Sequence, residues 1–339
     1  MPIEEIIRQD DLNQFPWQSI VTSVDTDTGE VLGRTITYDD GTKTDQRFEN
    51  GVLRESFQSD NFDQFGQPLP GGGAKRWESI QTSYDAEGKP EFKTIIFDDG
   101  TRTDQRFENG VLRESFQSDN FDEFGQPLPG GGAKPWESIE TRFDANGRPE
   151  FKTIIFDDGT RTDQRFENGV LRETFKSDNF DQFGQPLPGG GAKPWESIAT
   201  RYDSEGNIDG RSVVFDNGVH KEQFYIDGIL SETLQTDGFD FREMPPADGG
   251  AFDWEAKIST FDTDGSLSSR TTVFDDKDVI IFNYENAQII ERLRIDGDGD
   301  EEWLLSVTTY ADAGPQTVNY ETLNDIPNEY LDYFGLTPT

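Results

Sequence analysis

Residues Trp77 to Pro135 read WESIQTSYDAEGKPEFKTIIFDDGTRTDQRFENGVLRESFQSDNFDEFGQPLPGGGAKP, and this stretch returns as Trp136 to Pro194 with only eight positions changed. Adjacent segments of nearly identical sequence are expected to adopt the same fold and to pack in the same way, which is typical of a repeat array. The sequence therefore predicts tandem repeats. Tryptophans mark the period, at successive intervals of 60, 59, 59 and 59: Trp17, Trp77, Trp136, Trp195 and Trp254.

Each repeat is predicted to contain four antiparallel strands. In the repeat that begins at Trp136 the strands are WESIETRFD, EFKTIIFD, TRTDQRFE and VLRETFKSD. Asp158-Gly159 and Asn168-Gly169 lie between them, and such pairs favour tight hairpins because glycine accepts a positive φ. In the third strand the charged residues alternate with the others, so one face of it is expected to be solvated. The predicted fold is all-β, with about five four-stranded antiparallel meander repeats of 59 residues.

Two arrangements of the repeats fit this pattern: an elongated open array and a five-bladed β-propeller. Propeller blades bury their faces against each other, and the polar third strand is poorly suited to that. We therefore expect the open array and keep the propeller as the alternative. The expected division of the chain is an N-terminal cap at 1–16, repeats at 17–76, 77–135 and 136–194, a diverged repeat at 195–253, a diverged acidic repeat at 254–302, and a partial repeat with a C-terminal cap at 303–339.

The caps and the linkers differ from the strands. We expect a short helix within Ile3 to Phe15, and a short helix or an irregular cap in TLNDIPNEYLDYFG near the C-terminus. The linker NFDQFGQPLPGGGAKP holds three prolines and four glycines, so it is not a central strand. Its Phe180, Phe183 and Leu187 are expected to fold back on the sheet near the next tryptophan. The repeated tryptophans are interpreted as core residues rather than as platforms for sugars.

The composition indicates a folded chain with thin cores and a strong negative charge. Hydrophobic residues make up 32% of the chain, below the roughly 45–50% of typical globular proteins, while aromatic residues reach 12%. The formal net charge is −38, and residues 254–339 alone hold 18 acids and 5 bases, a net of −13. Such a field repels nucleic acid and anionic membranes and attracts cations or basic partners. With no cysteine, disulfides and thiolate metal sites are excluded.

From the sequence we expect neither a membrane-spanning segment nor a cleaved leader. It has no run of 18 apolar residues. Its first residues, MPIEEIIRQDDLNQFPW, lack a basic region followed by an apolar one. We expect an extracellular protein that is exported without a cleaved N-terminal signal. Residence in a virus particle is the alternative.

The acidic run that begins at Asp296 is the sharpest local signal for a ligand. Asp296, Asp298 and Asp300 alternate with glycines, so that several carboxylate oxygens can converge on one Ca²⁺. The loop lacks the glutamate of an EF-hand, because Val307 stands in its place. The alternative is that this acidic run forms only a hairpin turn between two strands and binds no ion. We predict a calcium site at these three residues and no catalytic site.

Two other groups of residues offer chemistry that a site could use. Asp119, Asn120 and Asp122 recur in several repeats and could hold a cation, but Asp and Asn in loops more often cap local turns, and we expect turn capping. His220 is the only histidine, which excludes any site with several histidines. It is expected to be an ordinary strand or surface residue.

The frame W-x-S-I-x-T-x-[YF]-D-x-x-G, followed by [YF]-D-D-G-T and F-E-N-G-x-L, resembles the tandem repeats of secreted bacterial hemolysin-type calcium-binding (RTX-class) proteins. It is loosely similar to YD and MORN-like repeats. The resemblance extends from Trp17 to Asp300, although the calcium-binding nonapeptide G-G-x-G-x-D-x-U-x is absent. It implies a secreted repeat region, with calcium binding limited to the loop from Asp296 to Asp300.

These observations favour a non-enzymatic structural or interaction protein. We expect an extracellular spacer or adhesin-like element whose partner is a protein or polysaccharide surface, or a second copy of itself. A fibre or decoration protein of a virus particle is the alternative. A polysaccharide-active enzyme is the third interpretation, since carboxylates are abundant but no pair of them stands out.

Overall fold

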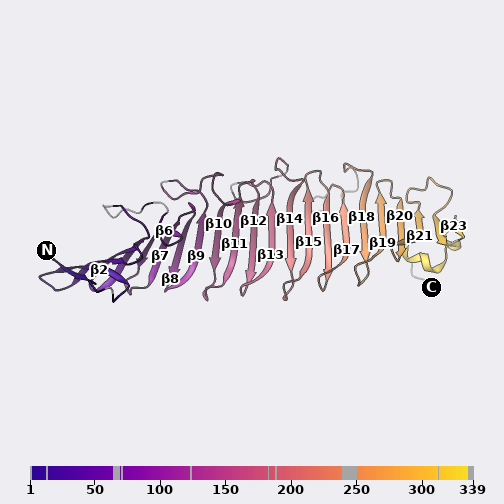
Figure 1. Cartoon of the computed structure of the whole chain (residues 1–339). Coiled ribbons are helices and arrows are strands. Elements are labelled where there is room, and N and C mark those ends of the chain that lie inside the picture. The colour runs from indigo at the N-terminus through magenta and orange to yellow at the C-terminus, as the bar shows by residue number, and fades with distance from the viewer. Residues whose placement is uncertain are drawn as a thin grey trace. The chain divides into compact units, whose positions relative to one another are not determined.

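The computed structural model describes residues 2–12, 14–63, 69, 72–122, 124–181, 183–187, 189–238, 250–311 and 313–334. These residues hold 23 strands and two short 3₁₀ helices, which confirms the all-β prediction (Figure 1). The chain forms two compact units, Met1–Leu171 and Arg172–Thr339. The boundary between them falls inside a strand of the third repeat.

Strands β1 to β12 belong to the first unit: β1 (Ile3–Gln9), β2 (Trp17–Asp25), β3 (Val31–Tyr38), β4 (Lys43–Glu49), β5 (Val52–Ser59), β6 (Trp77–Tyr84), β7 (Pro90–Phe97), β8 (Arg102–Glu108), β9 (Val111–Ser118), β10 (Trp136–Phe143), β11 (Pro149–Phe156) and β12 (Arg161–Glu167).

The second unit begins within β13 and ends in two short helices: β13 (Val170–Ser177), β14 (Trp195–Tyr202), β15 (Ile208–Phe215), β16 (His220–Ile226), β17 (Ile229–Thr236), β18 (Trp254–Phe261), β19 (Leu267–Phe274), β20 (Val279–Glu285), β21 (Gln288–Ile295), β22 (Leu305–Ala311), β23 (Gly314–Tyr320), η1 (Leu323–Asp325) and η2 (Asn328–Phe334).

Within each unit every strand pairs antiparallel with the next strand along the chain, so the sheet is an open meander. In the first unit the last strand of one repeat pairs with the first strand of the next, as β5 does with β6 and β9 with β10. The same holds for β13 with β14 and for β17 with β18 in the second unit. The tandem array of four-stranded repeats is confirmed. The five-bladed propeller is wrong, because the linkers return the chain to the adjacent sheet edge instead of starting a separate blade.

The predicted hairpin turns form as expected. Asn109 and Gly110 both adopt positive φ, 53° and 79°, between β8 and β9. That combination belongs to the type I′ turn, whose twist matches the twist of the flanking strands. Asn168 and Gly169 repeat it with 53° and 81°.

Large apolar residues are buried together at the C-terminal end of the second unit. Ile281, Leu293, Leu305 and Val307 pack there with Ile326, and η2 covers them with Tyr330, Leu331 and Phe334. The prediction of a short helix or irregular cap at this end is confirmed. Elsewhere the most deeply buried side chains are small and polar, as in Ser118 and Ser177 at 0% exposure. A sheet without a second layer hides only short side chains, which are screened by their longer neighbours.

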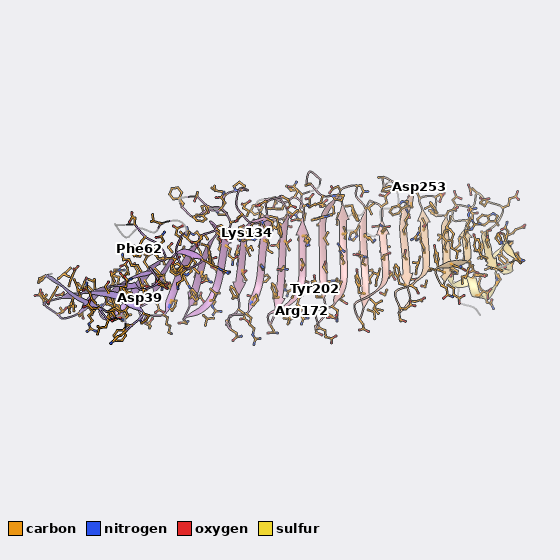
Figure 2. All side chains as sticks on the ribbon, in the orientation of Figure 1. Asp39, Phe62, Lys134, Arg172, Tyr202 and Asp253 are labelled. Carbon is orange, nitrogen blue, oxygen red and sulfur yellow. The ribbon has the colours of Figure 1, made fainter. Side chains whose placement is uncertain are left out.

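Ion pairs cross the charged strands, as the alternating pattern predicts. Arg106 on β8 lies opposite Glu114 on β9, with Nε 3.0 Å from Oε2. The Arg106 guanidinium also contacts Glu108, and its hydrogen bonds hold the pKa of Glu114 below the usual value. Side chains project from the strands throughout the chain (Figure 2). Arg172, labelled there, donates from Nη1 to the carbonyl of Asp203, the residue after the labelled Tyr202.

Three expectations from the sequence are wrong or hold only in part. The segment Ile3 to Phe15 begins with strand β1 and not with a helix, because the free edge of β2 offers it seven consecutive pairings. Of the three linker residues expected to fold back on the sheet, Phe183 does not, since it is 75% exposed, whereas Leu187 is 39% exposed and Phe180 is half-buried. The tryptophans are half-buried except Trp254, which is 7% exposed and is covered by Phe252 and Lys257.

Candidate functional site

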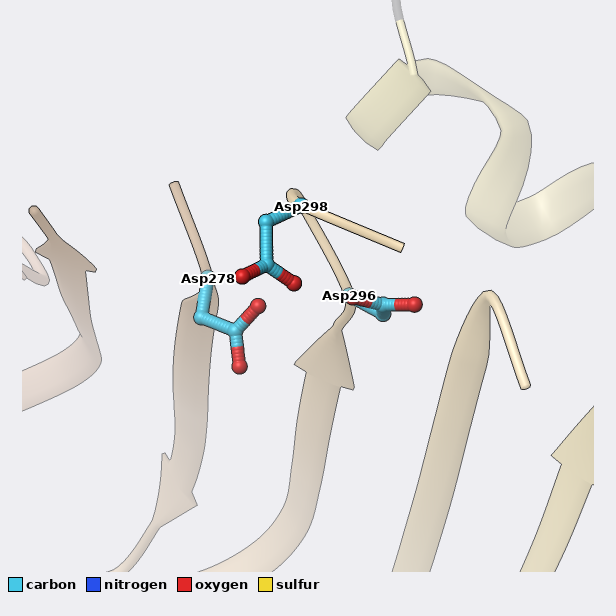
Figure 3. A group of neighbouring side chains, drawn as sticks. All are labelled: Asp278, Asp296 and Asp298. Carbon is cyan, nitrogen blue, oxygen red and sulfur yellow. The ribbon is translucent and has the colours of Figure 1, made fainter. Parts of the chain in front are cut away.

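Three aspartates at the end of the β20–β21 pair form the candidate metal centre. Asp278, Asp296 and Asp298 each offer a carboxylate oxygen, and these oxygens all lie within 4.8 Å of one another (Figure 3). Asp278 directly precedes β20 and Asp296 directly follows β21. They meet because Val279 pairs with Ile295. Two oxygens bound to one Ca²⁺ at about 2.4 Å lie at most about 4.8 Å apart, so the spacing suits that ion.

The structure changes the membership of the predicted site. It brings Asp296 and Asp298 together as expected, adds Asp278, and leaves Asp300 outside the group. The charge of Asp298 raises the pKa of Asp300 above its usual value. A whole hairpin separates Asp278 from Asp296 along the chain, so only the register of two paired strands reveals their contact. The sequence did hold a signal for the membership of Asp278 in this group. Asp278 stands just before a strand, and that strand begins the hairpin that precedes the acidic run.

Backbone amides already hold these carboxylates. Asp296 accepts hydrogen bonds from the N–H of Gly299 at 2.8 Å and of Glu301 at 3.4 Å. Asp278 accepts one from Gly297 at 3.0 Å. The group is therefore organised as a set of turns whose backbone amides fix the carboxylates.

Asp296 is also the fifth copy of an acid that recurs once in each repeat. Asp119 Oδ1 accepts the N–H of Ala133 at 3.1 Å, and Oδ2 accepts the N–H of Lys134 at 2.9 Å. These bonds join the end of β9 to the chain that enters the next repeat. The same position anchors the following loop in other repeats, through Asp60, Asp178 and Asp237. We call Asp60, Asp119, Asp178 and Asp237 the anchoring aspartates. They could have been found from the sequence, because they recur at the 59-residue period of the repeat.

The neighbouring loop residues cap turns, as expected. Asp122 Oδ1 accepts the N–H groups of Phe124 at 2.8 Å and Gln126 at 2.9 Å. Asn120 donates from Nδ2 to the carbonyl of Gly130 at 3.1 Å. Beyond the anchor, Lys134 reaches across to Asp99, with Nζ 2.8 Å from Oδ2, and this bond is the largest cause that lowers the pKa of Asp99 to about 2.

Two repeats of the first unit present an aromatic recess on the sheet surface, which the sequence pattern did not predict. In the second repeat Phe92, 50% exposed, lines a recess of about 230 Å³. In the third repeat Phe151, 45% exposed, lines one of about 320 Å³. We call these two the phenylalanine recesses. Phe92 and Phe151 are equivalent positions of consecutive repeats and occupy the same place on β7 and β11.

Four of the polar residues that line the recess in the second repeat are bound to each other in pairs. Thr94 donates from Oγ1 to Asp104 at 2.6 Å, and Arg106 is bound to Glu114. An exposed ring beside fixed donors and acceptors suits an uncharged polyhydroxyl ligand or a polar protein surface.

His220 is a buried strand residue on β16, in agreement with the expectation. Its Nε2 lies 2.6 Å from Ser212 Oγ and 3.9 Å from Glu222 Oε1. A catalytic Ser–His–acid arrangement places the acid on the other ring nitrogen, so these contacts do not reproduce it. Burial lowers the pKa of His220. Among the described residues no helix is long and apolar enough to span a membrane.

Comparison with known proteins places the chain in no family. No family model and no curated protein sequence matches it. Two solved structures are similar in part. The crystal structure of TcdB2-TccC3 has 9% sequence identity and a TM-score of 0.17, over 86% of this chain and 22% of that one. The periplasmic gluconolactonase PpgL of Pseudomonas aeruginosa has 11% identity and a TM-score of 0.15, over 94% of this chain and 97% of that one. This chain thus spans about a fifth of the first of these structures.

Proposed function

We propose that this protein is a non-enzymatic extracellular β-repeat spacer that presents adhesive surfaces at regular intervals. The observation that carries the proposal is the repeated junction between repeats. Asp60, Asp119 and Asp178 close successive junctions with the same pair of backbone hydrogen bonds, Asp237 keeps one bond of that pair, and each repeat continues the sheet of the previous one within its unit. A junction that can be copied without altering its neighbours sets a distance by the number of repeats.

The phenylalanine recesses support the adhesive part of the proposal. Their rings, Phe92 on β7 and Phe151 on β11, lie four strands apart in the first unit, which corresponds to roughly 19 Å at the usual strand spacing, although the other residues that line the two recesses differ. Partners with a repeating surface, such as a polysaccharide, would engage both recesses at once and gain avidity from weak single contacts.

Deleting Trp136–Pro194 tests the spacer. Trp195 then follows Pro135 as Trp136 does now, and we expect a soluble protein with unchanged β-sheet circular dichroism. Its maximum dimension in small-angle scattering should fall by roughly four strand spacings, about 19 Å. A second variant that duplicates the same residues should lengthen the particle by a similar step. Loss of the β signal in the deletion variant would contradict a modular array.

A polysaccharide and protein array tests adhesion. The double variant Phe92→Ser with Phe151→Ser should lose the binding that the unaltered protein shows. Phe124→Ser is the matched control, since Phe124 is 78% exposed but lies in a linker outside the recesses. Release of shortened sugars from any bound polysaccharide would instead support a polysaccharide-active enzyme.

A further inference from the structure

Strand β1 is an edge of the sheet in the first unit and pairs on one side only, with β2. All seven of its residues are exposed, including Ile3 at 61%, Ile6 at 46% and Ile7 at 60%. It pairs with β2 through seven consecutive residues without a bulge. Natural proteins usually protect such an edge with a bulge, a very short strand or charged side chains, and of these β1 has only the charged side chains of Glu4, Glu5 and Arg8. An edge of seven residues with three exposed isoleucines and no bulge is therefore a surface for another strand, and its charged residues decide which strand fits.

The backbone direction along β1 shows which groups face outward. The N–H of Asp10 donates to the carbonyl of Gln18, and the N–H of Thr26 donates to the carbonyl of Pro2. Backbone groups alternate sides along a strand, so the even-numbered residues turn theirs toward β2. The N–H and C=O groups of the odd-numbered residues point to the open side: Ile3, Glu5, Ile7 and Gln9.

A second β1 strand fits this edge in one antiparallel register. With the two copies centred on Ile6, the outward residues face each other as Ile3 with Gln9 and Glu5 with Ile7. Glu4 of each copy then stands opposite Arg8 of the other, on both sides of the central Ile6 pair. These are non-hydrogen-bonded positions, where Cα atoms approach to about 4.5 Å and side chains interact most closely.

Two neighbouring registers also place the outward N–H and C=O groups of the two strands opposite each other, but they are less favourable than the register centred on Ile6. Centring on Glu5 places Glu5 opposite its own copy, and centring on Ile7 places Glu4 opposite Asp10. Both put like charges in direct contact, and both leave part of the strand unpaired.

We propose that β1 joins two copies of this protein edge to edge, as a two-fold antiparallel pair centred on Ile6. The contact is isologous, so it closes after two copies and does not grow into a filament through this edge. The proposal concerns β1 alone and holds whether or not the repeats act as a spacer.

Charge reversal tests both the dimer and its register on the full chain. Sedimentation velocity over a concentration series should show a dimer for the unaltered protein. Glu4→Arg or Arg8→Glu should each weaken dimerisation about tenfold or more, because each turns two attractive contacts into repulsive ones. The combined variant Glu4→Arg with Arg8→Glu should restore the dimer. Within one chain these residues lie roughly 13 Å apart along the strand, so they do not pair internally and rescue reports the contact between copies.

Two further variants separate the dimer from effects on folding or on total charge. Glu91→Arg, at an exposed position of β7, makes the same charge change away from the edge and should leave the dimer intact. Ile7→Pro removes an outward N–H without taking one from the β2 pairing, so it should give a monomer with unchanged circular dichroism. A monomer at every concentration of the unaltered protein, or a dimer that the single reversals leave unchanged, would overturn the proposal.

Discussion

The Asp119 carboxylate occupies the space that a side chain on Gly132 would need. A Cβ atom on Gly132 would come within 1.7 Å of Asp119 Oδ2. The same relationship recurs between the other anchoring aspartates and their glycines, at 1.8 Å for Gly73, 1.7 Å for Gly191 and 1.9 Å for Gly250. The last glycine of the GGG motif is thus explained by a close approach to a carboxylate. It is this approach that lets the carboxylate reach the next two amides.

Replacing Gly132 with alanine should destabilise the protein by about 2–3 kcal/mol. The added methyl group displaces the carboxylate and breaks two hydrogen bonds to a charged acceptor, which typically contribute about 1.5–3 kcal/mol each before relaxation. Urea unfolding measures the change. Gly33→Ala is the control, because a Cβ there would meet only the Gln46 carbonyl at an ordinary 3.5 Å. Equal effects of the two substitutions would show that the close approach is unimportant.

Calcium should raise the melting temperature at millimolar concentration, through the mass action of a ligand that binds only the folded state. The gain should disappear in Asp278→Asn and in Asp298→Asn, whose carboxylates belong to the cluster. Asp300→Asn should keep it, which distinguishes the arrangement in the structure from the one that the sequence predicts. Differential scanning calorimetry gives the shift.

Selectivity separates a calcium site from charge screening in this acidic region. Sodium at matched ionic strength should not reproduce the gain, and magnesium should give less, since it requires shorter and more regular coordination. Equal stabilisation by all three salts would show that the three aspartates form only a turn.

His220 should make the protein less stable as the pH falls from about 7 to 5. Its pKa is lowered by burial below the usual 6.5, so the unfolded chain takes up the proton first. The stabilisation is complete above the unfolded pKa and is lost as the pH falls toward the folded one. His220→Gln should flatten this part of the curve in urea unfolding at a series of pH values.

A second loss at more acidic pH comes from other groups and should persist in His220→Gln. Asp40 and Asp99 have pKa values lowered to about 2, chiefly by hydrogen bonds from Lys75 and Lys134. Their contribution is complete above pH 3.8 and disappears as the pH falls toward 2. An unchanged slope between pH 7 and 5 in His220→Gln would assign that slope to other residues.

Tryptophan substitutions should differ between repeats according to burial. Trp254→Ala should cost roughly 3–5 kcal/mol, as for a buried aromatic residue. Trp254 stacks on Phe252, with ring centroids 5.4 Å apart, and the Lys257 ammonium lies 3.9 Å from its ring centre. Trp136 is half-buried, so Trp136→Ala should cost about 1–3 kcal/mol. Equal losses in thermal unfolding would show that the exposure of the indole does not determine its contribution.

Much of the local structure follows from the sequence because short-range chemistry determines it. The spacing of the tryptophans locates the repeats, and Asn109-Gly110 and its copies locate the hairpins, since both residues of that turn need positive φ. The alternation along β8 correctly predicts the charged row and its pairing with β9. Asp296 and Asp298 were recognisable as neighbours because one short loop holds both.

The remaining features depend on contacts between residues that are distant along the chain. β1 has no strong signal of its own and becomes a strand because β2 leaves an edge for it. Asp278 joins Asp296 only through the register of β20 and β21. The period and the turns, each encoded within a few residues, were therefore determined by the sequence itself. The exposure of the tryptophans and the composition of the acidic site were decided by tertiary structure, because strand pairing determines which surfaces are covered.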